Sequence, residues 1–406
     1  MLVNAVLRMV TRFHLLIWAL LITFGANTSF AQGSNAEFQK LLQQKASFEQ
    51  TDFAALQLEQ PVVRLVPVSD KREVAVSGLI NIRAGADEFL RSYREGMTRK
   101  NNSAILEIGS FAKEPALTDL QDLTIDGQDI EDLKECVVGD CQVKLSAPMI
   151  ERFRKEINWQ ASDYQVKATN LFKQMLSEYV RDYRNRGDAA LIEYNDKGNE
   201  VSLANEHRAL TSAAGYINDL LASKESGLQF LEDAIVWSKI KFGLKPVIAI
   251  NHITIYRRNG DVGPQVLVAS KQIYANHYFN AFLALTAFVS IPDSGAYLVY
   301  ENRSRADGLE GPFGKIKRGV VEKKALAGLK SILVDSKASL DGRTLSPTAA
   351  EFSSHGSYGW SRRLFGGIRP LLWLLMLSAL IAFLALGKRR IDSNTSKTLK
   401  PESAKS

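Results

Sequence analysis

An uncharged apolar run of 17 residues near the C-terminus, Leu371 to Gly387 (LLWLLMLSALIAFLALG), constrains this 406-residue chain more than any other feature. At a helical rise of 1.5 Å per residue, the run would be about 25 Å long, against roughly 30 Å for the hydrocarbon core of a bilayer. Arg369 can extend its charged end to the lipid headgroups. We therefore predict one transmembrane helix over 369–387. The alternative is a helix buried in a protein core.

A second apolar run lies at the N-terminus, from Phe13 to Ala26 (FHLLIWALLITFGA). It follows a basic stretch that ends at Arg12, and it precedes Ser29-Phe30-Ala31, which has small residues at both cleavage-site positions. This three-part layout is typical of a secretory signal peptide, so we predict one over residues 1–31. The alternative is a membrane anchor that is not cleaved.

The two apolar runs together predict how the chain is oriented. Lys388-Arg389-Arg390 follows the C-terminal run directly, and positive charge favours the cytoplasmic side of a membrane. A signal peptide exports the chain that follows it, so residues 388–406 would form a cytoplasmic tail. We expect a single-pass protein of the cytoplasmic (inner) membrane whose ectodomain lies outside the cytoplasm, in the periplasm.

The net charge of +7 is concentrated beside these apolar runs. Residues 32–361 contain 40 Lys and Arg against 42 Asp and Glu, a net charge of −2. A domain that binds nucleic acid needs a concentrated basic surface to neutralise phosphates. We therefore expect no nucleic-acid partner.

The chain has two cysteines, Cys136 and Cys141, which bracket the turn-forming sequence Val137-Val138-Gly139-Asp140. In an oxidising compartment this spacing favours a local disulfide, which we predict. A thioredoxin-like redox pair would need C-x-x-C, and a metal site would need two further ligands, although no His lies within sixty residues. No Walker or dinucleotide-binding glycine pattern follows a strand, so we expect neither a metal nor another cofactor.

Hydrophobic periodicity predicts the organisation of the exported part. We expect a polar lead over 32–60, an ectodomain over 61–335 and a Ser-, Gly- and Thr-rich tether over 336–368. Alternating apolar residues predict strands over 61–67, 73–83, 104–111, 247–257, 265–279, 281–291 and 296–305. Apolar residues three and four apart predict a helix opened by residues 84–87 and others over 166–184, 205–222, 228–242 and 315–335. The fold class is therefore α+β, with an antiparallel sheet, a helical block at 148–243, a long C-terminal helix and the transmembrane helix.

The order of elements over residues 73–335, a meander closed by a C-terminal helix, resembles the START-like helix-grip fold. In that fold a curved sheet wraps the terminal helix around an apolar cavity. The chain also resembles an exported bacterial family that combines this layout with a C-terminal membrane anchor. The resemblance rests on element order alone, and it implies a cavity beneath the terminal helix.

Five polar residues of the predicted meander are candidates for ligand binding: Lys271, Tyr274, His277, Arg303 and Arg305. Strict alternation would place Lys271 and His277 on one face of their strand and Tyr274 on the other. Arginine forks match carboxylate or phosphate groups, so the two arginines suit an anionic head group at the mouth of a cavity. The alternative is a solvated outer face on which the arginines pair with neighbouring acids.

These features favour a non-catalytic protein that binds an apolar or amphipathic small molecule, such as an envelope lipid. The alternative is a cell-envelope scaffold that contacts other proteins and has a filled core. A third hypothesis is a hydrolase or cyclase that uses His277 or His252 with Tyr274. The chain lacks the G-x-S-x-G elbow of α/β-hydrolases, and we assign no catalytic residues.

Overall fold

The computed structural model describes residues 39–40, 42–43, 48–97, 105–213, 227–241, 245–258, 264–291, 295–307, 309 and 314–342. The predicted signal peptide, transmembrane helix and cytoplasmic tail lie outside these residues, as does most of the predicted tether. Within the described ranges, no helix has both the length and the apolar character that a membrane span requires.

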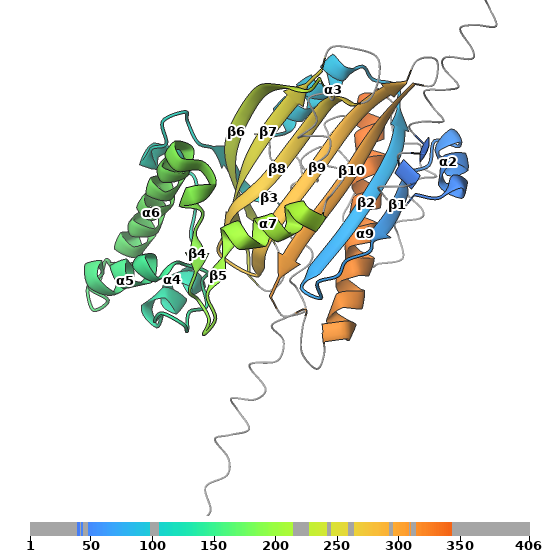
Figure 1. Cartoon of the computed structure of the whole chain (residues 1–406). Coiled ribbons are helices and arrows are strands. Elements are labelled where there is room, and N and C mark those ends of the chain that lie inside the picture. Colours follow the sequence, from blue (N-terminus) through green and yellow to red (C-terminus); the bar gives the residue numbers. More distant parts are fainter. Residues whose placement is uncertain are drawn as a thin grey trace, which may run out of the picture.

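The fold is α+β and is built on an eight-stranded sheet with the strand order β1-β2-β10-β9-β8-β7-β6-β3 (Figure 1). The strand pairs described in it are antiparallel. Its strands are β1 (Val62–Val66), β2 (Glu73–Ile82), β3 (Ile105–Ser110), β6 (Gln229–Ile240), β7 (Val247–Arg257), β8 (Pro264–Ala275), β9 (Phe279–Ile291) and β10 (Gly295–Ala306). A separate pair is formed by β4 (Glu193–Tyr194) and β5 (Val201–Ser202).

Helices cover both faces of the large sheet. The α-helices are α2 (Gln50–Gln57), α3 (Ala86–Gly96), α4 (Gly127–Lys134), α5 (Ala147–Glu156), α6 (Tyr164–Arg186), α7 (Leu203–Ala213) and α9 (Gly314–Leu340). Two short 3₁₀ turns are η1 (Leu117–Leu120) and η2 (Gly187–Ala190). In Figure 1, α9 lies behind the sheet and α7 crosses in front of it, while α4, α5 and α6 form a group beside it.

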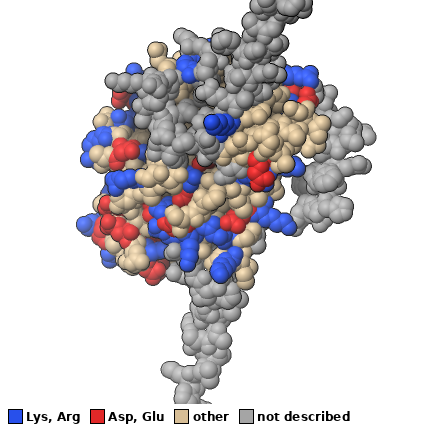
Figure 2. Space-filling model, turned by 45° about the vertical axis from the view of Figure 1, so that its right-hand side comes forward, with Lys and Arg blue, Asp and Glu red and all other residues tan. Residues whose placement is uncertain are grey.

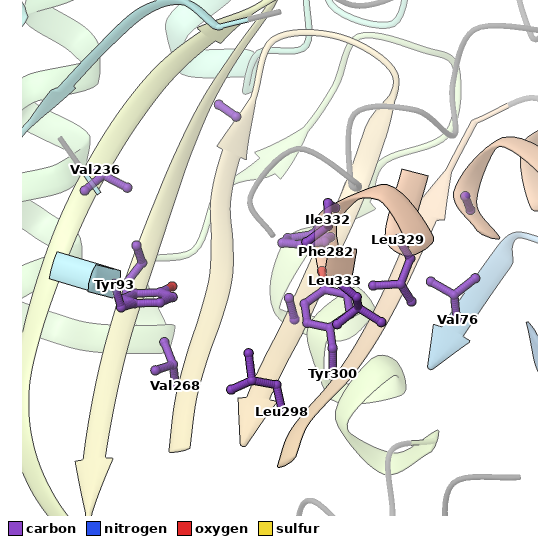
Figure 3. Packing of buried hydrophobic residues seen from close by; sticks show 14 of the residues in the cluster. Val76, Tyr93, Val236, Val268, Phe282, Leu298, Tyr300, Leu329, Ile332 and Leu333 are labelled. Carbon is purple, nitrogen blue, oxygen red and sulfur yellow. The ribbon is translucent and has the colours of Figure 1, made fainter. Parts of the chain in front are cut away.

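We call the side of the sheet that faces α9 and α3 the inner face. Leu329, Ile332 and Leu333 of α9 pack there against Phe282 and Tyr300 (Figure 3). The opposite side, the outer face, packs against α6 and α7, with α2 over its β1–β2 edge. The alternation of apolar side chains along each strand therefore fills two cores, one on each face.

Alternation also explains β9, whose sequence is apolar at nearly every position. Phe282 and Phe288 belong to the inner core, whereas Ala281 belongs to the outer core. The strand lies between β8 and β10 in the interior of the sheet. The prediction of a covered strand over 281–291 is confirmed.

Residues 228–242 form a strand rather than the helix that we predicted. β6 pairs with β7 on one side and with β3 on the other. Val236 points into the inner core, and Ile235 and Trp237 point into the outer core, so the run has a period of two. Branched and aromatic side chains suit a strand, and pairing with distant residues decides between two readings of a short apolar run. The helical block predicted at 148–243 is therefore shorter, with α5, α6 and α7 as its described helices.

The C-terminal helix is longer than predicted. α9 continues to Leu340, five residues into the segment that we assigned to the tether. It approaches β2 closely at Gly78, where an added Cβ atom would lie 2.8 Å from Leu333 Cδ1 and 2.9 Å from Leu329 Cδ2. The glycine therefore lets the helix pack directly against the backbone of the strand.

The prediction of a cysteine pair is confirmed. The Sγ atoms of Cys136 and Cys141 lie 1.96 Å apart, which is disulfide distance. Both side chains are buried in the outer core. The loop between them is held to the chain before β5 by hydrogen bonds from the backbone N–H groups of Gly139 and Cys141 to the carbonyls of Asn195 and Asp196.

Candidate functional site

The positions of the predicted site residues depend on an irregularity in β8. In the pairing with β7, Asn251 lies opposite Gln272, but Ile250 lies opposite Tyr274, so Ile273 is an extra residue in the ladder. A β-bulge of this kind breaks the strict alternation that we assumed for the strand. Tyr274 consequently points to the outer face, as Lys271 does, rather than to the opposite one.

Lys271 lines a groove of about 590 Å³ between the outer face and α7. Its Nζ atom lies 2.5 Å from Oδ1 of Asp188, and His207 and Arg208 of α7 line the same groove. On the side of the molecule shown in Figure 2, Lys and Arg side chains are interspersed with Asp and Glu. This groove likewise contains both signs of charge.

Tyr274 lies in the outer core rather than in a groove. Its side chain is fully buried beside the rings of Phe172, Tyr179 and Tyr194. Its hydroxyl donates a hydrogen bond of 3.0 Å to the carbonyl of Lys144. Burial raises the pKa of this phenol well above its ordinary value, so the group remains protonated.

His277 belongs to a buried network that joins the segment after β8 to α4. Its Nε2 lies 3.0 Å from both carboxylate oxygens of Asp129, and its Nδ1 lies 3.1 Å from the carbonyl of Gln142. Burial raises the pKa of Asp129, but His277 and Lys245 outweigh it and hold that pKa below its usual value. The arrangement is a structural hydrogen-bond network that joins distant parts of the chain.

The two arginines of β10 are buried and bound to carboxylates. Arg303 donates to Glu301 at 2.7 Å and to Glu73 at 2.6 Å. Arg305 donates to Glu206 of α7 at 3.1 Å and also to Asp70. Each guanidinium thus has acidic partners within the protein, so an anionic head group would have to compete with them.

A different set of residues, absent from our sequence predictions, forms a polar cluster on the inner face. The cluster consists of Ser238, Asn251, Ser270, Gln272 and Asn302, which are between 0 and 4% exposed. Its members come from β6, β7, β8 and β10. Each lies on the same face of its strand as apolar residues of the inner core, such as Val236, Ile253 and Val268.

Strand register brings these residues together. Asn251 lies directly opposite Gln272, and Ser270 is two positions from Gln272 on the same face. Ala284 separates Ser270 from Asn302, because it pairs with both across the sheet. We call these five residues the inner polar cluster.

Each member of the inner polar cluster has a buried oxygen without a hydrogen-bond partner within the protein as described: Ser238 Oγ, Asn251 Oδ1, Ser270 Oγ, Gln272 Oε1 and Asn302 Oδ1. Burying a polar group without a partner costs about 1–3 kcal/mol. Buried polar groups are therefore nearly always paired, with protein, ordered water or a ligand. The five oxygens on this apolar face therefore need donors from ordered water or from a bound molecule.

The sequence contains a signal for part of this cluster. In 247–257, Asn251 has the same parity as Ile253 and Ile255, so a strand that buries these isoleucines must also bury the amide. Recognising the cluster as a whole needs the pairing of four strands, which alternation within one strand does not supply.

A smaller groove of about 430 Å³ on the outer face contains His252. The Tyr183 hydroxyl lies 3.0 Å from Nδ1 of His252, and Asp233 Oδ2 lies 3.2 Å from Nε2. Burial lowers the pKa of this imidazole. The phenol beside it is Tyr183, whereas the enzyme hypothesis paired a histidine with Tyr274, which lies in the outer core.

Comparison of the chain with models of known protein families, with curated proteins and with solved structures finds no match.

Proposed function

We propose that this chain is a membrane-anchored extracytoplasmic protein that binds an apolar or amphipathic molecule, such as an envelope lipid, without catalysis. The ligand would lie against the inner face of the sheet, in the position of the cavity of a START-like helix-grip fold. The signal peptide over 1–31 and the membrane span over 369–387 would hold the ectodomain outside the cytoplasm. The Cys136–Cys141 pair supports this compartment, because disulfides persist where the surroundings are oxidising.

The observation that carries the proposal is the inner polar cluster. Its oxygens lie on a face that is otherwise lined by apolar side chains, and they have no partner among the described residues. An apolar lining with a few convergent polar groups is the usual composition of a small-molecule site.

The packing of helices on the inner face supports the same location. α9 packs chiefly against β1 and β2, whereas α3 contacts β8 and β9. In Figure 3, Tyr93 of α3 lies with Val236 and Val268, well apart from the group around Leu329 and Leu333 of α9. Four members of the inner polar cluster belong to β6, β7 and β8, away from the main contacts of α9.

A matched pair of variants on β9 tests the proposal. Ala284 lies on the inner face between Ser270 and Asn302, whereas Ala287 lies on the outer face of the same strand and is half-buried. Ala284→Phe should fill the proposed site, and Ala287→Phe makes the same change on the other side. We expect mass spectrometry of the full-length protein, purified from its native membrane, to detect an amphipathic molecule in the wild type and in Ala287→Phe.

The molecule should be at least tenfold depleted in Ala284→Phe, because an added phenyl ring would occupy its space. Circular dichroism and the unfolding temperature of each preparation show whether the variant is folded. Equal amounts in both variants would place the molecule elsewhere. Absence of any bound molecule from the wild type would instead favour an envelope scaffold with a filled core.

A further inference from the structure

The chemistry of the inner polar cluster points to the kind of head group that the ligand has. We infer that the polar end of the ligand is uncharged and carries several hydrogen-bond donors, as a polyol does. This inference rests on the proposed binding function and makes it more specific.

The atoms that lack partners define the donors that the ligand must supply. In Asn251, Gln272 and Asn302 the unpartnered atom is the amide oxygen, which can only accept a hydrogen bond. The other two are the hydroxyl oxygens of Ser238 and Ser270, which can accept or donate. A ligand without donors, such as an ester or a hydrocarbon, would leave the three amide oxygens unpaired.

The spacing of the oxygens requires more than one donor. Asn251 and Gln272 face each other on adjacent strands, so a single group can reach both. Asn302 is two strands away from Ser270, which corresponds to about 10 Å between backbones. A head group that reaches both ends of the cluster therefore needs donors spread over several atoms.

The scarcity of charged residues beside the cluster argues against an ionic head group. On the inner face, the described positions of β7 from Ala249 to Ile255 and those of β8, β9 and β10 contain no Lys, Arg, Asp or Glu. Arg257, at the end of β7 on the same face, is already paired with Asp87 of α3 at 2.7 Å. A phosphate or carboxylate there would be a buried charge without a partner, which is costly. An ammonium group would meet neutral oxygens but no carboxylate. Arg303 and Arg305 do not change this, because their carboxylate partners Glu73, Glu301 and Glu206 already hold them.

Three probes with the same acyl chain separate the possible head groups. Monoolein has two free hydroxyls, methyl oleate has no donor, and oleoyl lysophosphatidate has a charged phosphate. We would measure their binding to the full-length protein in nanodiscs. Monoolein should bind at least about tenfold more tightly than each of the other two, since hydrogen bonds in a buried site discriminate by this order.

A variant of the cluster shows whether the oxygens make this difference. Asn251→Leu keeps the approximate shape of the side chain and removes its oxygen, so monoolein affinity should fall about tenfold while methyl oleate affinity stays the same. Thr254→Val, on the opposite face of the same strand, should change neither. The unfolding temperature of Asn251→Leu should not fall, because an unpaired buried oxygen has been replaced by an apolar group.

The outcomes separate this inference from the proposed function. Equal affinity for monoolein and methyl oleate, unchanged in Asn251→Leu, would mean that ordered water fills the cluster, and it would overturn the head-group inference alone. Tighter binding of lysophosphatidate would also overturn it. If none of the three probes binds and no molecule co-purifies, the proposed binding function itself fails.

Discussion

Buried polar side chains in this protein fall into two kinds: those paired within the chain and those without a partner among the described residues. Arg303 is buried and forms ion pairs with Glu73 and Glu301. Burial nevertheless raises the pKa of Glu301, because desolvation outweighs the attraction of the arginine. The inner polar cluster has no such compensation within the described chain. Buried polar groups are rarely left unpaired, so the proposed ligand site rests on the second pattern.

A further buried residue, His207 on α7, should make stability depend on pH. Its Nε2 donates a 2.6 Å hydrogen bond to the carbonyl of Gln272, and burial lowers its pKa from 6.5 to about 4. At pH values between about 4 and 6.5, His207 binds a proton in the unfolded chain but not in the folded chain. This contribution to stability is complete above pH 6.5 and is lost as the pH falls towards 4, by about 3 kcal/mol.

Urea unfolding of the full-length protein between pH 8 and pH 4 measures this effect. His207→Gln retains a donor for the carbonyl of Gln272 but does not titrate, so its stability should change less over the same interval. The same pH dependence in the wild type and the variant would show that His207 is not responsible.

At the scale of elements, the close packing of α9 against β2 requires a residue without a side chain at Gly78. Gly78→Val would place new carbon atoms within 3 Å of Leu329 and Leu333, so the helix must move away from the strand. We expect the free energy of unfolding to fall by about 2 kcal/mol, as is typical of an overpacked core.

Gly85→Ala is the control for this prediction, because no atom lies within 4 Å of an added Cβ there. Because Gly85 is the N-cap of α3, alanine there should lower the free energy of unfolding by no more than about 1 kcal/mol. Denaturant unfolding of both variants measures the difference. Equal stability of Gly78→Val and Gly85→Ala would show that α9 can shift at no cost.

The elements also show where local patterns were sufficient. β1, β2, β3, β7, β9, β10 and α6 lie close to their predicted ranges, because the alternation or helical spacing of their apolar residues is strong. β6 was wrongly predicted as a helix, since Leu231, Ile235 and Ser238 also have helical spacing. Only its ladders with β3 and β7 decide between the two structures.

At the scale of the whole molecule, the orientation in the membrane remains a prediction from the two apolar runs. A reporter that is active only outside the cytoplasm, fused after Gly342, should be active, because α9 ends just before this point. The same reporter after Ser406 should be inactive. Activity after Ser406 but not after Gly342 would show that the chain has the opposite orientation.

The amino-acid sequence alone was sufficient for the α+β class, the antiparallel meander and the cysteine pair, because these follow from the spacing of residues close together in the chain. The faces of Lys271 and Tyr274 depended instead on a bulge, which exists only in the pairing of β8 with β7. The inner polar cluster likewise needs four strands in register. Sequence alternation shows that a side chain is buried, but only tertiary structure decides which other side chains are buried beside it, and whether they supply the hydrogen bonds that it lacks.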